Sequence, residues 1–180
     1  MKHSGTQTIE TDRLILRKFE LSDAQNMFDN YCKKDKVTEY LTWPAHKSVE
    51  DTKSYLLNFV LPKYDEENTY RWAIVWKANN EVIGCIDVCS SSDGNRRAEL
   101  GWVIGDDYWG KGIMPEAAES VVKYLFSVGY ERIQAVHRTV NLKSGRVMQK
   151  IGMQYEGTLK KYVADNRNVL VDCCMYAITK

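Results

Sequence analysis

The sequence predicts one domain of the α+β class, built on a mixed β-sheet. The chain has 180 residues, which suits a single domain and is enough to bury a core. Hydrophobic residues make up 44% and charged residues 27%, an ordinary globular composition. Strand-like and helix-like segments follow one another, and no repeat, low-complexity tract or linker divides residues 1–180. Because the expected order mixes hairpins with crossovers, the sheet should contain antiparallel and parallel pairs.

The expected elements run in the order strand, two helices, three strands, helix, strand, helix and two strands. They are strand Arg13–Arg17, helices 22–31 and 48–61, strands Tyr70–Lys77, Glu81–Cys89 and Arg97–Ile104, helix Met114–Val128, strand Arg132–Val140, helix Leu142–Ile151, and strands Met153–Leu159 and Val169–Ile178.

Capping signals place the first two helices. Ser22 and Gln25 have the spacing of a capping box, which predicts a helix start at Ser22. Ser48 and Asp51 form a weaker cap of the same kind, and Pro62 should end the helix that follows. The aromatic segment between these helices is expected to be a loop.

Alternation and turn residues define the middle strands. Asn79-Asn80 and Asp93-Gly94-Asn95 suit tight turns between consecutive strands. In the strand after the second turn, Ala98, Leu100, Trp102 and Ile104 should face one way, and Glu99, Gly101 and Val103 the other.

Glycine, proline and asparagine bound the last two helices. Pro115 suits the first turn of one helix and Gly129 its C-terminal cap. Asn141 can cap the next helix, which Gly152 should end.

Charge and hydropathy favour a cytosolic protein without nucleic-acid or membrane partners. The net charge is +1, so no broad basic footprint is present. No run of 18 apolar residues predicts a membrane span, and the first residues lack the apolar region of a signal peptide.

The cysteines are expected to be reduced and mostly buried. There are five, an odd number, and Cys173 and Cys174 are adjacent in an apolar run. The three histidines, His3, His46 and His137, have no paired ligand spacing, so no metal site is predicted.

Residues 99–117 are the most informative stretch for function. They are expected to form a strand, a glycine-bearing turn and the opening of a helix. Free backbone N–H groups and the positive end of the helix dipole then converge, which suits a phosphate or pyrophosphate.

One interpretation of this turn is a P-loop. Gly105, Gly110 and Lys111 match the pattern G-x-x-x-x-G-K-[ST], but Gly112 stands where a hydroxyl should bind Mg²⁺. Two carboxylates and two bulky rings also fill the loop, so a nucleoside-triphosphate site is disfavoured.

The other interpretation is a shorter turn on Gly110 and Gly112. It resembles the pyrophosphate loop Q/R-x-x-G-x-G/A of the GNAT-type N-acetyltransferase superfamily, with Asp107 in place of Gln or Arg. Residues 108–117 contain the motifs Tyr-Trp-Gly-Lys-Gly-Ile and Glu-Ala. These motifs are similar to those of the branch that acetylates N-terminal residues of ribosomal proteins. The order of elements resembles that family from about Glu10 to Thr179.

The resemblance implies a central mixed, mostly antiparallel sheet of about seven strands flanked by about four helices. It also implies acetyl-CoA as cosubstrate and no metal. The cofactor-binding residues implied are Trp102, Val103, Ile104, Trp109, Gly110, Lys111, Gly112, Ile113, Met114, Asn141 and Ser144.

Glu99 is the candidate general base, because Gly101 beside it should leave room for a substrate or a water. The alternative is a surface carboxylate paired with Arg96 or Arg97. Tyr155 is a lesser candidate base.

Ser144 is the candidate proton donor to the leaving thiolate, and its alternative role is helix capping. Many members of the family carry a tyrosine where this chain has Met148, which is expected to fill the core. Tyr40 and Trp43 are candidate walls of the acceptor cleft, and packing is their alternative.

The sequence therefore predicts an acetyl-CoA-dependent N-acetyltransferase acting on a primary amine. The favoured acceptor is the N-terminal residue of a ribosomal protein, by direct attack in a ternary complex. A small amine acceptor and a non-catalytic acyl-CoA-binding module remain open, as does a homodimer.

Overall fold

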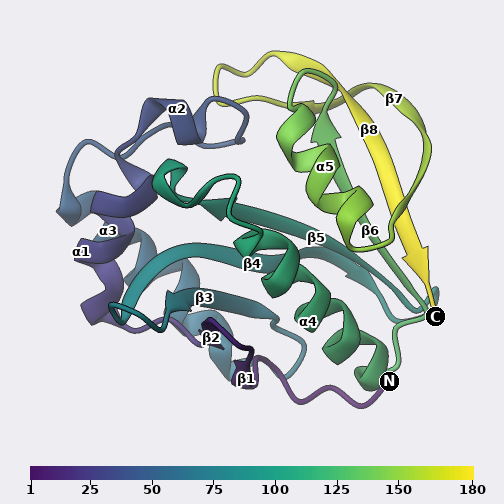
Figure 1. The fold of residues 1–180 in the computed structure, drawn as a ribbon, viewed down its shortest axis with the longest axis horizontal. Helices are drawn as coiled ribbons and strands as arrows, with labels where there is room; N and C mark the ends of the chain where they lie inside the picture. Colours follow the sequence, from purple (N-terminus) through teal and green to yellow (C-terminus); the bar gives the residue numbers. More distant parts are fainter.

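The protein is built on one eight-stranded sheet, seen in a computed structural model that describes residues 1–180 (Figure 1). The strands are β1 (Ile9–Glu10), β2 (Leu14–Arg17), β3 (Arg71–Trp76), β4 (Glu81–Ser92), β5 (Arg97–Ile104), β6 (Arg132–Arg138), β7 (Gln154–Ala164) and β8 (Leu170–Thr179). Their order across the sheet is β1-β2-β3-β4-β5-β6-β8-β7. Only β5 and β6 pair in parallel, so the predicted mixed, mostly antiparallel sheet is confirmed.

Helices cover both faces of this sheet. They are α1 (Ala24–Met27), α2 (Asp35–Thr38), α3 (Val49–Tyr55), α4 (Ile113–Val128) and α5 (Leu142–Lys150). Neighbouring strand residues belong to two different cores: Trp72 and Ile74 pack in the cluster that contains α4, whereas Ala73 and Val75 pack with α1 and α3. Strand alternation therefore produces one core on each face.

The first helix starts at a different cap from the one expected. The backbone N–H of Glu20 donates to the Asp23 carboxylate at 2.8 Å, so this pair forms the capping box, and Ser22 lies inside a short 3₁₀ turn. The helix then continues through α1 into a π-turn at Phe28–Cys32. The short α2 follows in a stretch to which the sequence assigned no element, and Val37 and Thr38 are buried there. The aromatic segment after it, residues 39–44, contains no helix or strand, as expected.

The second helix has the predicted cap but a different end. The backbone N–H of Asp51 donates to the Ser48 hydroxyl at 3.2 Å. After α3 the chain continues through a π-turn at Leu56–Val60 and a 3₁₀ turn at Leu61–Asp65. Pro62 does not end the helix, because it occupies the start of that last turn, where a missing N–H costs nothing.

The ends of α4 and α5 are as predicted. Gly129 and Gly152, which follow them, have φ values of 117° and 84°, a region that favours glycine. Met148 of α5 is 1% exposed and fills the core, as expected. None of the helices is long and apolar enough to cross a bilayer.

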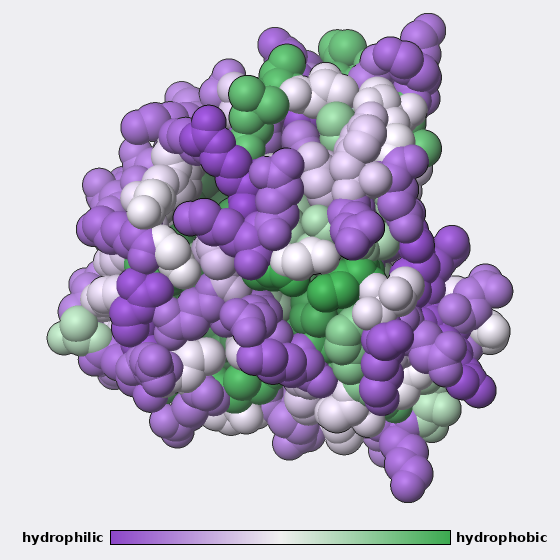
Figure 2. Space-filling model, turned by 45° about the vertical axis from the view of Figure 1, so that its right-hand side comes forward, coloured by the Kyte–Doolittle hydropathy of each residue, from purple (hydrophilic) through white to green (hydrophobic).

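The parallel strands β5 and β6 separate halfway along their length. Their last paired residues are Leu100 and Ala135, yet β5 continues to Ile104 and β6 to Arg138. The other edge of β5 stays paired with β4 as far as Ile104. The backbone groups of residues 101–104 on the β6 side therefore border a gap in the sheet. A space-filling view shows apolar side chains in a hollow near the middle of the surface, ringed by hydrophilic ones (Figure 2).

A β-bulge lies beside this gap. The β4–β5 register shifts between Val88 and Ser90, which leaves Cys89 as the extra residue. A Cβ atom on Gly101 would lie far inside van der Waals contact with the Cys89 sulfur. The prediction that Gly101 leaves room for substrate is therefore wrong, because the thiol occupies that space. All five cysteines are free, although Cys89 is exposed rather than buried.

We expect Gly101→Ala to destabilise the fold by about 1–3 kcal/mol, because the added methyl overpacks against Cys89. Thermal unfolding followed by circular dichroism measures the loss. Cys89→Ala in the same chain should restore most of the stability, with Cys89→Ala alone as the control. A wild-type melting temperature for Gly101→Ala would contradict this account.

Candidate active site

The glycine turn after β5 forms a loop rich in free backbone donors. Gly105 caps a 3₁₀ turn at Asp106–Tyr108, and Gly110 and Gly112 adopt φ values of 75° and 73° before α4 begins. The backbone N–H groups of residues 110–114 donate to no acceptor in the protein. Pro115 follows and has no N–H. A helix N-terminus with consecutive free donors is a ready anion site.

Residues of the turn between β1 and β2 clamp this loop. The Arg13 guanidinium donates to the Lys111 carbonyl at 2.9 Å and to the Glu116 carboxylate at 2.6 Å. The Thr11 hydroxyl also donates to Glu116, at 2.6 Å. Burial alone would raise the pKa of Glu116, but the hydrogen bonds from Thr11 and Arg13 hold it below its ordinary value. The clamp binds carbonyl and carboxylate groups and leaves the N–H groups free.

The two loop carboxylates are paired with lysines. Lys34 donates to both Asp106 and Asp107 at 2.7 Å, and Lys36 reaches Asp106 at 3.3 Å. The hydrogen bond from Lys34 is the main reason why the pKa of Asp106 is lowered. These bonds tie the loop to the chain around α2.

Trp109 connects the loop with α5 across the gap in the sheet. Its indole N–H donates to the Ile104 carbonyl at 2.9 Å. The Lys143 ammonium lies 3.9 Å from the centre of its ring, and the Lys36 ammonium lies 5.3 Å away. Such contacts between cations and an indole are favourable, so they hold the two sides of the gap together.

The start of α5 faces the gap from the β6 side. The Asn141 side chain accepts a hydrogen bond from the Ser144 N–H at 3.4 Å, which is the predicted cap. Ser144 is half-buried, and its hydroxyl makes no hydrogen bond within the chain. A Cβ on Gly145 would lie 2.7 Å from the His137 ring, so glycine lets α5 approach β6 closely. Trp102, Val103 and Ile104 border the gap on the β5 side.

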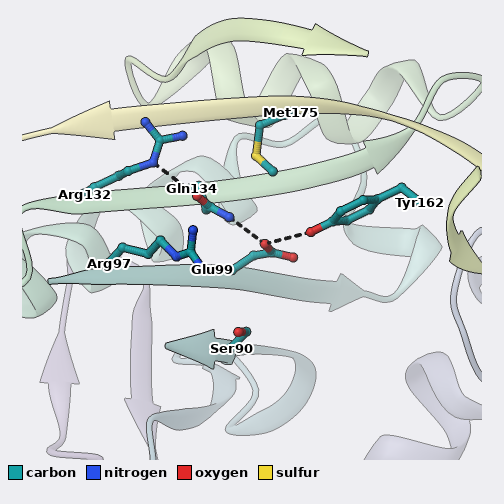
Figure 3. A pocket seen from close by; sticks show the side chains of 7 residues that line it. All are labelled: Ser90, Arg97, Glu99, Arg132, Gln134, Tyr162 and Met175. Carbon is teal, nitrogen blue, oxygen red and sulfur yellow. Dashed lines mark hydrogen bonds between the residues drawn. The ribbon is translucent and has the colours of Figure 1, made fainter. Parts of the chain in front are cut away.

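Glu99 lines a cavity of about 460 Å³ on the same edge of β5, where β5 and β6 are still paired (Figure 3). The other lining residues are Ser90, Arg97, Arg132, Gln134, Tyr162 and Met175.

The Glu99 carboxylate is held by a chain of hydrogen bonds (Figure 3). The Gln134 amide donates to Oε2 of Glu99 at 2.8 Å, and the Tyr162 hydroxyl donates to the same oxygen at 3.5 Å. Arg132 donates to Oε1 of Gln134 at 3.1 Å and thereby fixes the orientation of the amide. The expected alternative pairing of Glu99 with Arg96 or Arg97 is absent, because Arg96 pairs with Glu131.

Tyr162 enters the site as a neutral phenol. Burial raises its pKa, and so do the charge of Glu99 and the hydrogen bond to it. Sequence reasoning missed Tyr162 and Gln134. Gln134 carried a signal, since it is a polar residue between Ile133 and Ala135, and it is 7% exposed in the structure.

Other predicted residues lie outside this cavity. Tyr155 packs at 5.4 Å on Tyr176, whose ring belongs to the α4 core, so Tyr155 lies on the face opposite Glu99. Tyr40 lies under the Arg138 guanidinium at 5.4 Å, and Trp43 packs on the α1–α3 core. No group of three or more His, Cys, Asp or Glu side chains in residues 1–180 is arranged to hold a metal ion.

The loop, the gap and the Arg13–Glu116 pair lie within one matched region of the sequence. Residues 13–154 match the family described as the acetyltransferase (GNAT) domain. The chain belongs to the GNAT acetyltransferase family. That family assignment, together with relatives named as N-acetyltransferases, makes it an N-acetyltransferase.

Three relatives illustrate the range of similarity. The uncharacterized N-acetyltransferase YoaA of Bacillus subtilis is 36% identical over 173 residues, which is 96% of either chain. The [ribosomal protein uS5]-alanine N-acetyltransferase of Escherichia coli is 24% identical, covering 86% of this chain and 82% of its own. The microcin C7 self-immunity acetyltransferase MccE, solved with acetyl-CoA and AMP, shares the fold with a TM-score of 0.84 at 21% identity, over 94% of both chains.

We expect Glu116→Gln to lower the stability by about 1–2 kcal/mol at pH 7, because a charged partner of Arg13 and Thr11 is lost. The carboxylate has its pKa lowered in the folded state. Its contribution is therefore present above the ordinary value of 4.5 and is lost as the pH falls below it. Melting temperatures from pH 7 to pH 3 should show the gap between variant and wild type closing.

Glu119→Gln is the matched control for this series, since Glu119 is an exposed residue of α4 paired only with Lys123. It should cost about 0.5 kcal/mol or less. A gap for Glu116→Gln that stays constant with pH would rule out the charged clamp.

Proposed function

We propose that this protein transfers the acetyl group of acetyl-CoA to the α-amine of a peptide N-terminus, by direct attack in a ternary complex. The observation that carries the proposal is the row of unpartnered N–H groups at residues 110–114, beside the gap between β5 and β6. The Glu99 cavity lies on the same edge of β5, at the paired end of the two strands. The strand β5 thus carries the Glu99 carboxylate and leads into the loop that forms the anion site.

In this proposal the cofactor site extends from the loop into the gap. The N–H groups of Gly110, Lys111, Gly112, Ile113 and Met114 bind the pyrophosphate, assisted by the dipole of α4. Trp109 frames the entrance, and Asn141 hydrogen-bonds the pantetheine arm. The acetyl-CoA complex of MccE supports this choice of cosubstrate, because that protein has the same fold.

Catalysis needs a neutral amine and a stabilised oxyanion. An α-amine has a pKa of about 8, so about a tenth of it is neutral at pH 7. Glu99 receives the amine proton as the new C–N bond forms. A backbone N–H of Trp102, Val103 or Ile104 binds the developing oxyanion, a contribution of about 3–4 kcal/mol.

Bound acetyl-CoA supplies an activated acetyl group, whose C–S bond breaks as the C–N bond forms. The Ser144 hydroxyl, at the start of α5, donates a hydrogen bond to the departing sulfur or relays a proton to it from bulk water. Because a CoA thiol has a pKa of about 8.5, its thiolate leaves readily and the donor is helpful rather than essential. This requirement fits a chain with Met148 in the core instead of a tyrosine.

The proposed acceptor is the α-amine of a peptide N-terminus. The name of the uS5-alanine N-acetyltransferase supports a peptide α-amine. Tyr40 and Trp43 remain the proposed walls of the cleft for the residues behind that amine. A panel of N-terminal peptides and small amines, assayed by release of free thiol, tests the choice: turnover of small amines alone would replace it.

We expect Gly112→Val to abolish acetyl-CoA binding, because its side chain would occupy the pyrophosphate's place and resist the φ of 73°. A Cβ at this position meets only the Arg13 guanidinium, at 3.7 Å, so the fold should largely survive. Isothermal titration calorimetry measures the affinity. Gly94→Val, in a remote turn with open space, is the control. Unchanged affinity in folded Gly112→Val would place the phosphates elsewhere.

We expect Glu99→Gln to lower kcat/KM about 10²–10⁴-fold at pH 7, because the proton acceptor is lost while the shape is kept. The defect should shrink toward pH 9, where an α-amine deprotonates itself. Acetyl-CoA affinity should hardly change. Glu131→Gln, an exposed carboxylate paired with Arg96, is the control. A defect independent of pH would make Glu99 a residue that binds the protonated amine.

A further inference from the structure

The Glu99 cavity contains one charged group that nothing in the protein neutralises. Arg97 and Arg132 both line it. The Arg132 guanidinium is fully engaged, because it binds the Glu156 carboxylate with both terminal nitrogens and Gln134 with Nε. Arg97 forms no side-chain hydrogen bond and no ion pair anywhere in residues 1–180. The cavity therefore offers a free guanidinium.

Arg97 and Glu99 are placed to contact the same small group of atoms. They are two residues apart on β5, so their side chains leave the same face about 6.6 Å apart. Both side chains rise toward Gln134 on the neighbouring strand (Figure 3). The charge of Arg97 also reaches Tyr162, since it offsets part of the rise in the pKa of that phenol.

The cofactor phosphates are too distant to be the partner of Arg97. Arg97 begins β5, and the loop starts after the strand ends at Ile104. A strand of this length separates Arg97 from Gly105 by about 26 Å. Arg97 is exposed where it lines the cavity, so an anion that enters with the acceptor can reach its guanidinium.

A plain amine would be a poor match for this pair of charges. A protonated amine next to Glu99 is repelled by the neighbouring guanidinium, and it leaves the guanidinium unpaired. An acceptor that carries a carboxylate near its amine satisfies both groups. Guanidinium binds carboxylate with paired, charge-assisted hydrogen bonds, so the pairing also orients the acceptor. Ser90, which pairs with Glu99 on the neighbouring strand β4, adds a hydroxyl to the same cavity.

We infer that Arg97 selects acceptors with a carboxylate within about two residues of the reactive amine. The inference rests on the proposed acetyl transfer at Glu99 and names the substrate class of that site. The carboxylate can be an acidic side chain near a peptide N-terminus or the carboxylate of a free amino acid. Arg97 binds it while Glu99 accepts the proton of the amine.

Paired acceptors test this inference. Two short peptides differ only in aspartate or asparagine at the second position, and free serine is compared with serine amide. Initial rates of thiol release give kcat and KM for each. We expect wild type to prefer the carboxylate member of at least one pair by about 10- to 100-fold in kcat/KM, mainly through KM. The pair that shows the preference identifies the source of the carboxylate.

The variant Arg97→Gln should remove that preference by raising KM for the carboxylate acceptor alone. Arg97→Lys should retain part of it, since a cation remains. Arg96→Gln is the matched control, because Arg96 adjoins Arg97 but lies outside the cavity and pairs with Glu131. Melting temperature and acetyl-CoA affinity should be unchanged in all three.

Three results would overturn the inference. Equal use of both members of each pair by wild type would refute it while leaving the proposed acetyl transfer intact. An equal loss by Arg97→Gln on charged and neutral acceptors would give Arg97 a structural role only. Failure of wild type to acetylate any amine, despite binding acetyl-CoA, would refute the proposed function and this inference with it.

Discussion

The site depends on the place where hydrogen bonding between β5 and β6 stops. Backbone donors and acceptors in a sheet are normally paired, and an interior strand with one bare edge is unusual. Here β5 is paired with β4 throughout but with β6 only as far as Leu100. The bare edge, the loop that follows it and the start of α5 all border one gap. Such an edge offers a ligand the backbone hydrogen bonds that continued pairing with β6 would have used.

Two sets of side chains keep the surroundings of this gap rigid without occupying its donors. Arg13 and Glu116 hold the loop from the sheet side, and Lys34 and Lys36, at the start of α2, hold its carboxylates. Gln134 similarly holds Glu99 through a single oxygen. In each case the bonds use carbonyl or carboxylate groups. Preorganised donors need no rearrangement when a ligand arrives, which is how such sites gain binding and rate.

Local signals predicted most of the fold. Much of the site could not be predicted, because it depends on the register between strands that are distant in the sequence. Ser48, Asn141 and Gly129 act within one helical turn, so their roles were readable from spacing. The box at Glu20 and Asp23 competed with an identical spacing two residues later, and spacing alone does not say which of the two forms. The meeting of Gln134 with Glu99 needs the register of a parallel pair 35 residues apart, which spacing does not encode. The bulge at Cys89 was invisible for the same reason.

The parallel pairing also has a consequence for how the chain reaches its native state. Antiparallel neighbours such as β3–β4 and β7–β8 are joined by turns and close quickly, whereas β5 and β6 meet only after the crossover through α4. Non-local pairings of this kind are slow because loop entropy is lost before contacts form. Residues 9–104 and 132–179 can therefore order before they join. Activity should then be the last property to appear during refolding, after the secondary structure is complete.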